Sequence, residues 1–460
     1  MREGELTVGA GASPGWAREA LVRAAWVGVA AHAAFLPVSM AGMQIGVGVA
    51  LGALLLLWAT GHRVWRWSPI HLPVLLLAGA ALLSVGIAWA TGAPPRSTDN
   101  AIFFRLLVVA VVVLPAIEVG PAGEPPERVR RRALRFAAIW IGVAILPSVL
   151  GWIQVRTGLD AMHALGLRDA PRQAPAPWAP GRYAAMGFFT WYVRYAHALA
   201  PAAAFAAALA LFAPLPRRTR ILFGVAAVIV SSSVVLTGSR SAWAGLALGG
   251  FVLALLSGPR VRRVAIPAAI AAALLAVLLS PGLRTRISRL DEPEATGDRE
   301  IIWRVCSAMI ADRPLTGVGY GALAQRSYPY YERLAPEFPM RAWCHQSFVT
   351  AWGEGGPLLA VALAAWFALL ARAFLRLHRT GDGLARAASA GALAALASLF
   401  VNALVHDVFW STEPMFAHGF LLAVAVALAR NVGPSPVEER ARGERVGVNG
   451  ANAQDGPSPA

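Results

Sequence analysis

Long apolar runs separated by short polar connectors dominate the sequence. The runs lack the alternation of apolar and polar positions that is typical of membrane β-strands. About 20 apolar residues in a helix cross the hydrocarbon core of a bilayer, and a helix satisfies its own backbone hydrogen bonds there. The pattern therefore predicts an all-α polytopic membrane protein with about 12 transmembrane helices, at about 20–38, 41–60, 70–90, 101–119, 134–155, 190–213, 219–237, 241–257, 264–280, 347–371, 386–405 and 414–430.

The composition supports this class of protein. Of the 460 residues, 57% are hydrophobic and 14% are charged, whereas a soluble domain has about 25% charged residues. These values exclude an ordinary soluble enzyme and a disordered chain. All 41 basic residues are arginine, and the net charge is +16. Because these arginines lie between the apolar runs and form no single patch, they do not indicate a nucleic-acid partner.

The distribution of arginine predicts the orientation of the helices. Every second short connector is rich in arginine, and the positive-inside rule places such connectors, and with them both termini, in the cytoplasm. The arginines that define this pattern are Arg63, Arg66, Arg128, Arg130, Arg131, Arg132, Arg217, Arg218, Arg220, Arg260, Arg262, Arg263, Arg372, Arg376, Arg379 and Arg386.

This topology divides the chain into segments. We expect a cytoplasmic N-terminus at 1–19, transmembrane helices 1–9 over 20–280, a long periplasmic loop over 281–346, helices 10–12 over 347–430, and a disordered cytoplasmic tail over 431–460. A second long outer connector lies at about 156–189. Most of the outer arginines lie in or beside these two long connectors, which indicates an anionic ligand on the outer face.

Arg240 lies where one predicted helix begins on the outer side. Ser239 or Thr237 can cap this helix, which leaves free N–H groups and the positive end of the helix dipole facing outward. A guanidinium beside such a helix end suits a phosphate or diphosphate at the membrane surface. The alternative is an interfacial arginine that only reaches the lipid headgroups.

A further helix is expected inside the long loop, over 299–311, ending before Arg313-Pro314. Arg299 would then lie in the first turn, where its charge opposes the helix dipole unless an anion or a carboxylate compensates. A bound anion is one interpretation. A surface ion pair with Asp298 or Glu300 is the other.

His345 lies where the long loop re-enters the membrane. A histidine there can act as a general base, because its ordinary pKa of about 6.5 is near working pH. A histidine that merely bonds a helix end gives the same pattern. The adjacent pair His406-Asp407, on the last outer turn, is the second candidate.

The remaining motifs do not indicate a specific catalytic or binding role. The stretch Thr316–Gly321 permits tight turns, and it lacks the Gly-Lys-Ser/Thr ending of a P-loop. Cys306 and Cys344 share the outer loop, where a disulfide can form, but one pair does not decide between bonded and free thiols. Since no cysteine–histidine set has zinc spacing and no Asp-x-Asp pair occurs, we expect neither a metal nor another cofactor.

Four segments together, in this order, resemble the O-antigen ligase and O-antigen polymerase family of bacterial membrane glycosyltransferases. They are Leu236–Trp243 (LTGSRSAW), Arg299–Trp303 (REIIW), Asp312–Gly321 (DRPLTGVGYG) and His345-Gln346 with Gly356 eleven residues after the histidine. The resemblance covers about 220–375, with a weaker match at Gly187-Phe188-Phe189.

The resemblance implies a GT-C-like fold with a partly helical periplasmic loop domain, in the bacterial inner membrane, with the active site on the periplasmic face. Members transfer a glycan from undecaprenyl diphosphate to a sugar hydroxyl with inversion and without a metal. By this resemblance, Arg240 and Arg299 would hold the diphosphate, and His345 would act on the acceptor hydroxyl. Further contacts to diphosphate or glycan are expected from Ser239, Arg304, Arg182, Arg194 and Tyr320.

Two alternatives stay open. Ligases of this family tend to have a small residue or a tyrosine three positions after the glycine at 356. Here that residue is Leu359, with Pro357 between, so the acceptor is either lipid A core, as for a ligase, or another glycan chain, as for a polymerase. A transporter or flippase is the second alternative. Transporters place ionisable residues near the middle of the membrane, and the predicted helices hold few of them.

Overall fold

The computed structural model describes residues 15–91, 105–106, 108–121, 124–176, 179–259, 261–263, 288, 293–339 and 343–430. Within these residues the regular structure is helical, and one isolated antiparallel bridge joins Pro175 and Tyr183. The helices are α1 (Gly15–Phe35), α2 (Met40–Ala59), α3 (His71–Ala90), η2 (Val109–Val113), α5 (Leu114–Glu118), α6 (Pro126–Thr157), α7 (Ala161–Ala164), α8 (Tyr192–Phe212), α9 (Arg217–Val235), α10 (Arg240–Leu256), α13 (Pro293–Asp312), α14 (Leu323–Arg326), α15 (Tyr328–Leu334), α16 (Ser347–Thr380), α17 (Gly383–Ala403), η3 (Val408–Trp410) and α18 (Thr412–Leu428).

These helices confirm an all-α multi-pass membrane protein. Seven described helices are long and apolar enough to cross a membrane, namely α2, α3, α6, α8, α9, α16 and α17. Helices α10 and α18 are apolar but shorter. The predicted run at 264–280 lies outside the described residues, as do parts of the run at 101–119, so the count of twelve stays a prediction.

Ala-rich helices form the centre of the bundle. Helix α8 packs against α9, α17 and α18, and α18 is buried along its whole length from Glu413 to Leu428. Small side chains let neighbouring backbones approach closely, which is how helices associate in lipid. A Cβ on Gly391 of α17, for example, would lie 2.5 Å from the ring of Phe205 in α8. The helices at the centre of the bundle are therefore tightly packed against one another.

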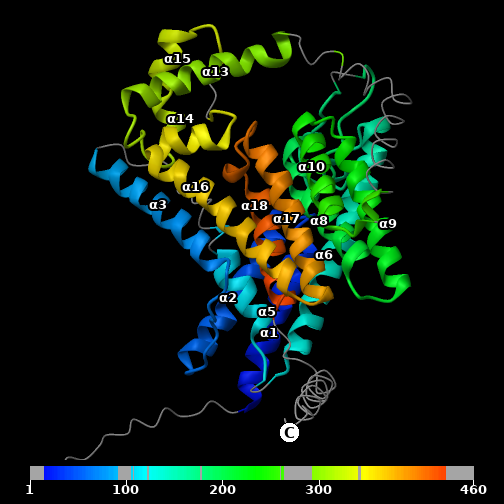
Figure 1. The fold of residues 1–460 in the computed structure, drawn as a ribbon. Coiled ribbons are helices and arrows are strands. Elements are labelled where there is room, and N and C mark those ends of the chain that lie inside the picture. The colour runs from blue at the N-terminus through cyan, green and yellow to red at the C-terminus, as the bar shows by residue number, and fades with distance from the viewer. Residues whose placement is uncertain are drawn as a thin grey trace, which may run out of the picture.

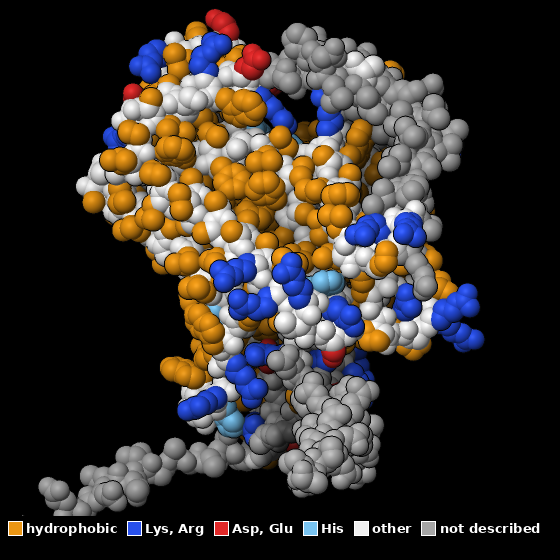
Figure 2. Space-filling model, in the orientation of Figure 1, with side chains coloured by type: hydrophobic (Ala, Val, Ile, Leu, Met, Phe, Trp, Pro, Cys, Tyr) orange, Lys and Arg blue, Asp and Glu red, His pale blue; other side chains and the backbone are white. Residues whose placement is uncertain are grey.

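The two ends of the bundle differ. Helices α13 and α15 lie together beyond one end, which we call the α13 end (Figure 1). At the opposite end, Arg18 of α1 donates a hydrogen bond to the Gly120 carbonyl after α5, and Arg430 after α18 pairs with Glu118. A broad apolar band lies between the ends, and arginine side chains gather along its lower border (Figure 2). The band is the surface expected of a protein in a bilayer.

Helix α16 is interrupted where the glycine-rich loop docks on it. Gly356 has φ 65° and ψ −167°, and Pro357 follows it inside the helix. Proline has no N–H to donate to the carbonyl four residues earlier. That carbonyl, on Gly353, instead accepts from the N–H of Val318 at 2.8 Å. The next carbonyl, on Glu354, accepts from the N–H of Gly319 at 2.8 Å, so the loop completes the hydrogen bonds that the kink leaves open.

Gly356→Ala is expected to destabilise the fold by about 3 kcal/mol or more, because this backbone region is essentially restricted to glycine. A Cβ at this position would also lie 2.1 Å from the carbonyl oxygen of Leu315. Gly250→Ala on α10 is the matched control, since no atom lies within 4 Å of its Cβ position. Thermal unfolding in detergent checks the prediction. Equal melting temperatures for the two variants would show that the kink does not depend on glycine.

Candidate functional site

A cavity of about 500 Å³ opens at the α13 end. Four segments line it: the start of α8, the first half of α13, the turn that precedes α16, and the connector between α17 and α18. The lining residues are Trp191, Tyr192, Val193, Arg194, His197, Asp298, Arg299, Ile302, Trp343, His345, His406, Asp407, Val408, Trp410 and Ser411. Because α13 itself lies beyond one end of the bundle (Figure 1), and the other positions lie near the start of α8 and in connectors, the cavity is at that end of the bundle and not at its middle.

The turn before α16 is tied to the connector between α17 and α18. The backbone N–H of His345 donates to Asp407 Oδ2 at 2.7 Å, and Thr350 Oγ1 donates to the other oxygen of Asp407. Ser347 Oγ donates to the His406 carbonyl at 2.7 Å. These bonds hold both candidates, His345 and the His406-Asp407 pair, side by side in the lining of one cavity.

His345 has a strained backbone. Its φ is 51°, and it is the one residue other than glycine with positive φ among the residues that the structure describes. Such a conformation costs of order 1–3 kcal/mol in a residue with a Cβ and persists where the surroundings enforce it. Strain of this kind often marks a functional position. Here it accompanies a side chain that lines the cavity.

Helix α13 carries Arg299 to the cavity. A disulfide joins Cys306 of α13 to Cys344, with Cα atoms 6.0 Å apart, and Trp303 Nε1 donates to the Cys344 carbonyl at 3.0 Å. The structure therefore gives a bonded pair where the sequence left both states open. The predicted helix is confirmed, but it begins at Pro293, so Arg299 does not lie in the first turn. The argument from the helix dipole at Arg299 was wrong for that reason.

Breaking the disulfide is expected to loosen α13. The two cysteines are 38 residues apart in sequence, and a crosslink over that separation stabilises by about 4 kcal/mol in the chain-entropy treatment. The Cys306→Ser/Cys344→Ser variant should therefore unfold at a lower temperature than the wild type. Treatment with a reductant should lower the wild-type melting temperature toward that of the variant and leave the variant unchanged. Identical melting curves would contradict the prediction.

Two guanidiniums interact at the α13 end. Burial lowers the pKa of Arg299, the positive charge of Arg240 lowers it further, and Tyr192 and Asp407 raise it. Arg240 is the first residue of α10 and does not belong to the described cavity lining, so it acts on Arg299 from beside the cavity. Like charges this close repel each other, and a bound anion relieves that repulsion. The arrangement is suited to an anionic ligand.

Asp407 lies in the connector between α17 and α18, and its burial raises its pKa to about 6. Hydrogen bonds from Thr350, His345 and Gln346 and the charge of Arg299 act in the opposite direction. The neighbouring His406 has a pKa well below its usual range, because it is buried and close to His197, Arg299 and His345. The cavity therefore favours a neutral His406.

The raised pKa of Asp407 makes stability depend on pH. Between pH 3.8, its ordinary value, and about 6, the folded state keeps a proton that the unfolded state releases. This contribution is fully present below pH 3.8 and is lost as the pH rises through about 6. We expect the melting temperature of the wild type to fall relative to that of Asp407→Asn over this range. A constant difference between the two proteins would refute the raised pKa, since other titrating groups are common to both.

Of the other predicted binding residues, one lines the cavity and the others are not in its described lining. Arg194 lines the cavity, and its Nη1 lies 3.9 Å from Glu413 Oε1. Ser239 is buried at the N-cap of α10, where its Oγ lies 3.2 Å from Ser241 Oγ and makes no cap hydrogen bond. The structure does not bring Arg182, Arg304 or Tyr320 into the described lining. The first two are exposed, and Tyr320 is buried with its N–H bonded to Ser84 Oγ at 2.9 Å.

Three aromatic residues of the site, Trp343, Trp410 and Tyr192, were not singled out from the sequence. Trp343 and Trp410 line the cavity with their ring centroids 6.3 Å apart, and Tyr192 lines it from the start of α8. The available signal was the occurrence of tryptophan and tyrosine at the ends of the apolar runs. The described residues include no group of three or more histidine, cysteine, aspartate or glutamate side chains placed to hold a metal ion.

Residues 225–364 match the family model described as O-antigen ligase. This part of the chain is an O-antigen ligase domain. The family predicted from the motifs is thereby confirmed. No curated protein matches the chain. The domain contains Arg240, Arg299 and His345, whereas Arg194 and the His406-Asp407 pair lie outside the matched residues. The cavity is therefore completed by segments on both sides of the O-antigen ligase domain.

Proposed function

We propose that the protein is a membrane glycosyltransferase that moves a glycan from undecaprenyl diphosphate to a sugar hydroxyl. The observation that carries this proposal is the cavity at the α13 end. It brings Arg299 and His345 together, with Arg240 close enough to shift the pKa of Arg299. Such a cavity offers cationic groups for a diphosphate and a basic group for a hydroxyl.

The α13 end is proposed to face the periplasm, in a protein of the bacterial inner membrane with both termini in the cytoplasm. The Cys306–Cys344 disulfide lies at this end, and disulfides persist in oxidising compartments such as the periplasm. The arginines near the other end of α16, such as Arg372 and Arg376, lie toward the opposite side, as the positive-inside rule requires.

The two guanidiniums would stabilise the leaving group. As the acceptor oxygen attacks the anomeric carbon from the side opposite the diphosphate, a C–O bond forms and the bond to the diphosphate oxygen breaks. The configuration is therefore inverted. Negative charge grows on the departing diphosphate, and Arg299 with Arg240 would stabilise it without a metal ion. Arginine suits this role because its planar fork can bond two phosphate oxygens at once.

His345 would take the proton of the acceptor hydroxyl. The buried carboxylate of Asp407 accepts the backbone N–H of His345, so Asp407 positions the histidine through the main chain. The Trp343 and Trp410 rings lie in the same cavity, and aromatic faces pack well against the apolar faces of sugars. Arg194 would contact the glycan from α8.

The position of the cavity favours transfer over transport. A transporter is expected to bind its substrate near the middle of the bilayer, but this cavity is lined by α13, the start of α8 and connectors at the α13 end. A flippase interpretation would require that purified protein moves a lipid-linked glycan across vesicles without forming a new glycosidic bond. Formation of a transfer product by the purified protein would contradict it.

A reconstituted assay tests the proposed reaction and distinguishes its two forms. Purified protein in vesicles receives a glycan linked to undecaprenyl diphosphate, with either core lipid or more donor as the acceptor, in the presence and absence of a metal chelator. One added block on core lipid would indicate a ligase, and a ladder of lengths would indicate a polymerase. Absence of any product with both acceptors would contradict the proposed function, and loss of product with chelator would contradict the metal-free mechanism.

A further inference from the structure

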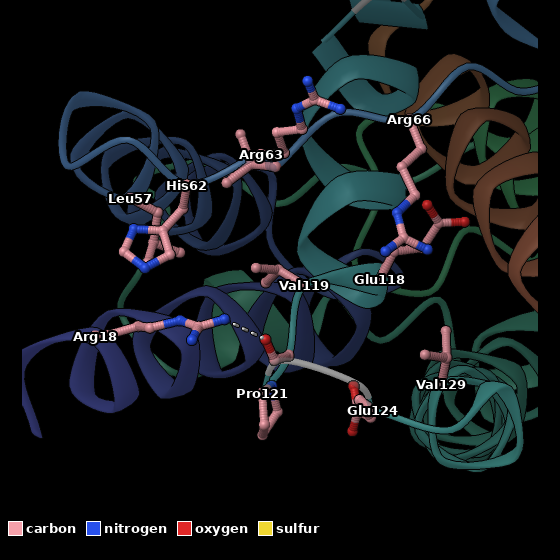
Figure 3. Close-up of a pocket in the computed structure, with 12 residues that line it drawn as sticks. Arg18, Leu57, His62, Arg63, Arg66, Glu118, Val119, Pro121, Glu124 and Val129 are labelled. Atoms are coloured by element: carbon pink, nitrogen blue, oxygen red, sulfur yellow. Dashed lines mark hydrogen bonds between the residues drawn. The ribbon is translucent and has the colours of Figure 1, made fainter. Parts of the chain in front are cut away.

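A second cavity lies at the end of the bundle opposite the proposed transfer site. Its volume is about 200 Å³, and its polar lining comes from Arg18, His62, Arg63, Arg66, Glu118 and Glu124. These residues belong to the start of α1, the connector between α2 and α3, and the segment between α5 and α6. Figure 3 shows Arg18 on one side of the cavity and Arg63 and Arg66 on the other.

The two carboxylates of this cavity are already engaged by arginines that do not line it. Arg430 donates to both oxygens of Glu118, at 2.6 and 2.7 Å. Arg132 donates to both oxygens of Glu124, at 3.1 and 2.8 Å. In such a bidentate pair, the guanidinium donates two N–H bonds to the two carboxylate oxygens, which makes the pair stronger than a single hydrogen bond. The two carboxylates are therefore neutralised before the lining arginines are considered.

The lining arginines keep an excess of positive charge. Among the described residues, no hydrogen bond or ion pair engages the side chain of Arg63 or of Arg66, although Figure 3 shows Arg66 pointing toward Glu118. Arg18 donates to the neutral carbonyl of Gly120 at 3.2 Å, which leaves its charge uncompensated. Three cationic side chains around a small cavity create a potential that attracts an anion.

Tryptophan side chains indicate the depth of the cavity. Trp16, Trp58 and Trp67, which are near the lining residues in sequence, are 75%, 61% and 67% exposed. Exposed tryptophan is characteristic of the boundary between lipid and water, where its ring lies among headgroups. Since this boundary carries the phosphates of the lipids, the cavity lies at the depth where phosphate is most abundant.

We propose that this cavity is a binding site for a phosphate group, supplied by the headgroup of an anionic phospholipid in the leaflet at that end. The guanidiniums of Arg63 and Arg66 would bond the phosphate oxygens from one side, and Arg18 would add its charge from the other. The site is separate from the proposed transfer cavity and binds its ligand whether or not the protein transfers glycans. Bound lipid would join three segments of the chain that meet at this end.

The test compares lipid binding by two double variants of equal charge. Arg63→Gln/Arg66→Gln removes the two arginines of the cavity. Arg217→Gln/Arg218→Gln removes two exposed arginines at the start of α9, at the same end of the bundle but outside the cavity lining. Each protein is placed in phosphatidylcholine nanodiscs with increasing phosphatidylglycerol, and retained lipid and melting temperature are measured. Inorganic phosphate in pure phosphatidylcholine nanodiscs tests a soluble source of the same group.

Phosphatidylglycerol should stabilise the wild type and the Arg217→Gln/Arg218→Gln variant and bind Arg63→Gln/Arg66→Gln about tenfold more weakly or worse, because each basic residue near an anionic surface contributes about 1 kcal/mol. Stabilisation by inorganic phosphate alone, lost only in Arg63→Gln/Arg66→Gln, would support the phosphate site and assign it to a soluble ligand. Equal weakening in both double variants, or no effect of either probe on the wild type, would overturn the proposal. Equal melting temperatures in pure phosphatidylcholine serve as the control for folding.

Discussion

Replacing Arg299 by alanine is expected to slow glycan transfer about a hundredfold or more, since this is the usual effect of removing one preorganised group that stabilises a leaving group. Arg299 is half-buried in the cavity wall, where water screens its charge less than at the surface. Its charge also interacts with that of Arg240, so Arg240→Ala should cause a loss of similar size. The rate of transfer in reconstituted vesicles measures both effects.

Two further variants define the origin of this loss. Arg299→Lys keeps the charge but removes the fork that bonds two oxygens, so most of the loss should remain. Arg326→Ala, on α14 and outside the cavity lining, removes a charge at the same end of the bundle and should transfer at the wild-type rate. If Arg326→Ala lost as much activity as Arg299→Ala, net charge at this end would explain the effect and the specific role of Arg299 would be rejected.

Replacing His345 by glycine is expected to lower transfer by about 10²–10⁴, the usual contribution of a general base. The same change should not weaken the fold, because glycine adopts a φ of 51° without strain. His345→Ala should lose activity equally but keep the strain of a side chain at positive φ. Transfer rate and melting temperature, measured on the same preparations, separate chemistry from stability.

A merely structural histidine would give a different result. If His345 only joined the turn to its surroundings, His345→Gly would lower the melting temperature and would reduce activity no more than it reduces the folded fraction. Activity near the wild-type level in a stable His345→Gly variant would remove the histidine from the mechanism.

Much of the fold could be predicted because hydrophobic runs in a bilayer are governed by length and backbone hydrogen bonding alone. Helices α2, α3, α8 and α17 lie within a few residues of the predicted runs, whereas α16 extends to Thr380, beyond the predicted end at 371. The start of α13 was missed because residues 293–298 carry no apolar periodicity. Proline at the first position of a helix, as at Pro293, was the local signal that favoured an earlier start.

The candidate site could be predicted only in part. The motifs pointed to Arg240, Arg299 and His345, but spacing along the chain does not show which loops meet in space. The contact between His345 and Asp407, 62 residues apart, depends on how α17 and α18 pack. Tyr320 lies in a motif that resembles the family, yet its loop serves the kink of α16, with its N–H bonded to Ser84. A glycine-rich sequence alone does not show whether such a loop binds a ligand or docks on a kinked helix.

A cryo-EM structure of the protein in nanodiscs, bound to a lipid-linked diphosphate sugar, tests the central claim most directly. We predict density for the diphosphate at the α13 end, within hydrogen-bonding distance of the Arg299 guanidinium and beside Arg240, with the sugar directed toward His345. A diphosphate bound near the middle of the bundle, or at this end but away from both arginines, would contradict the account.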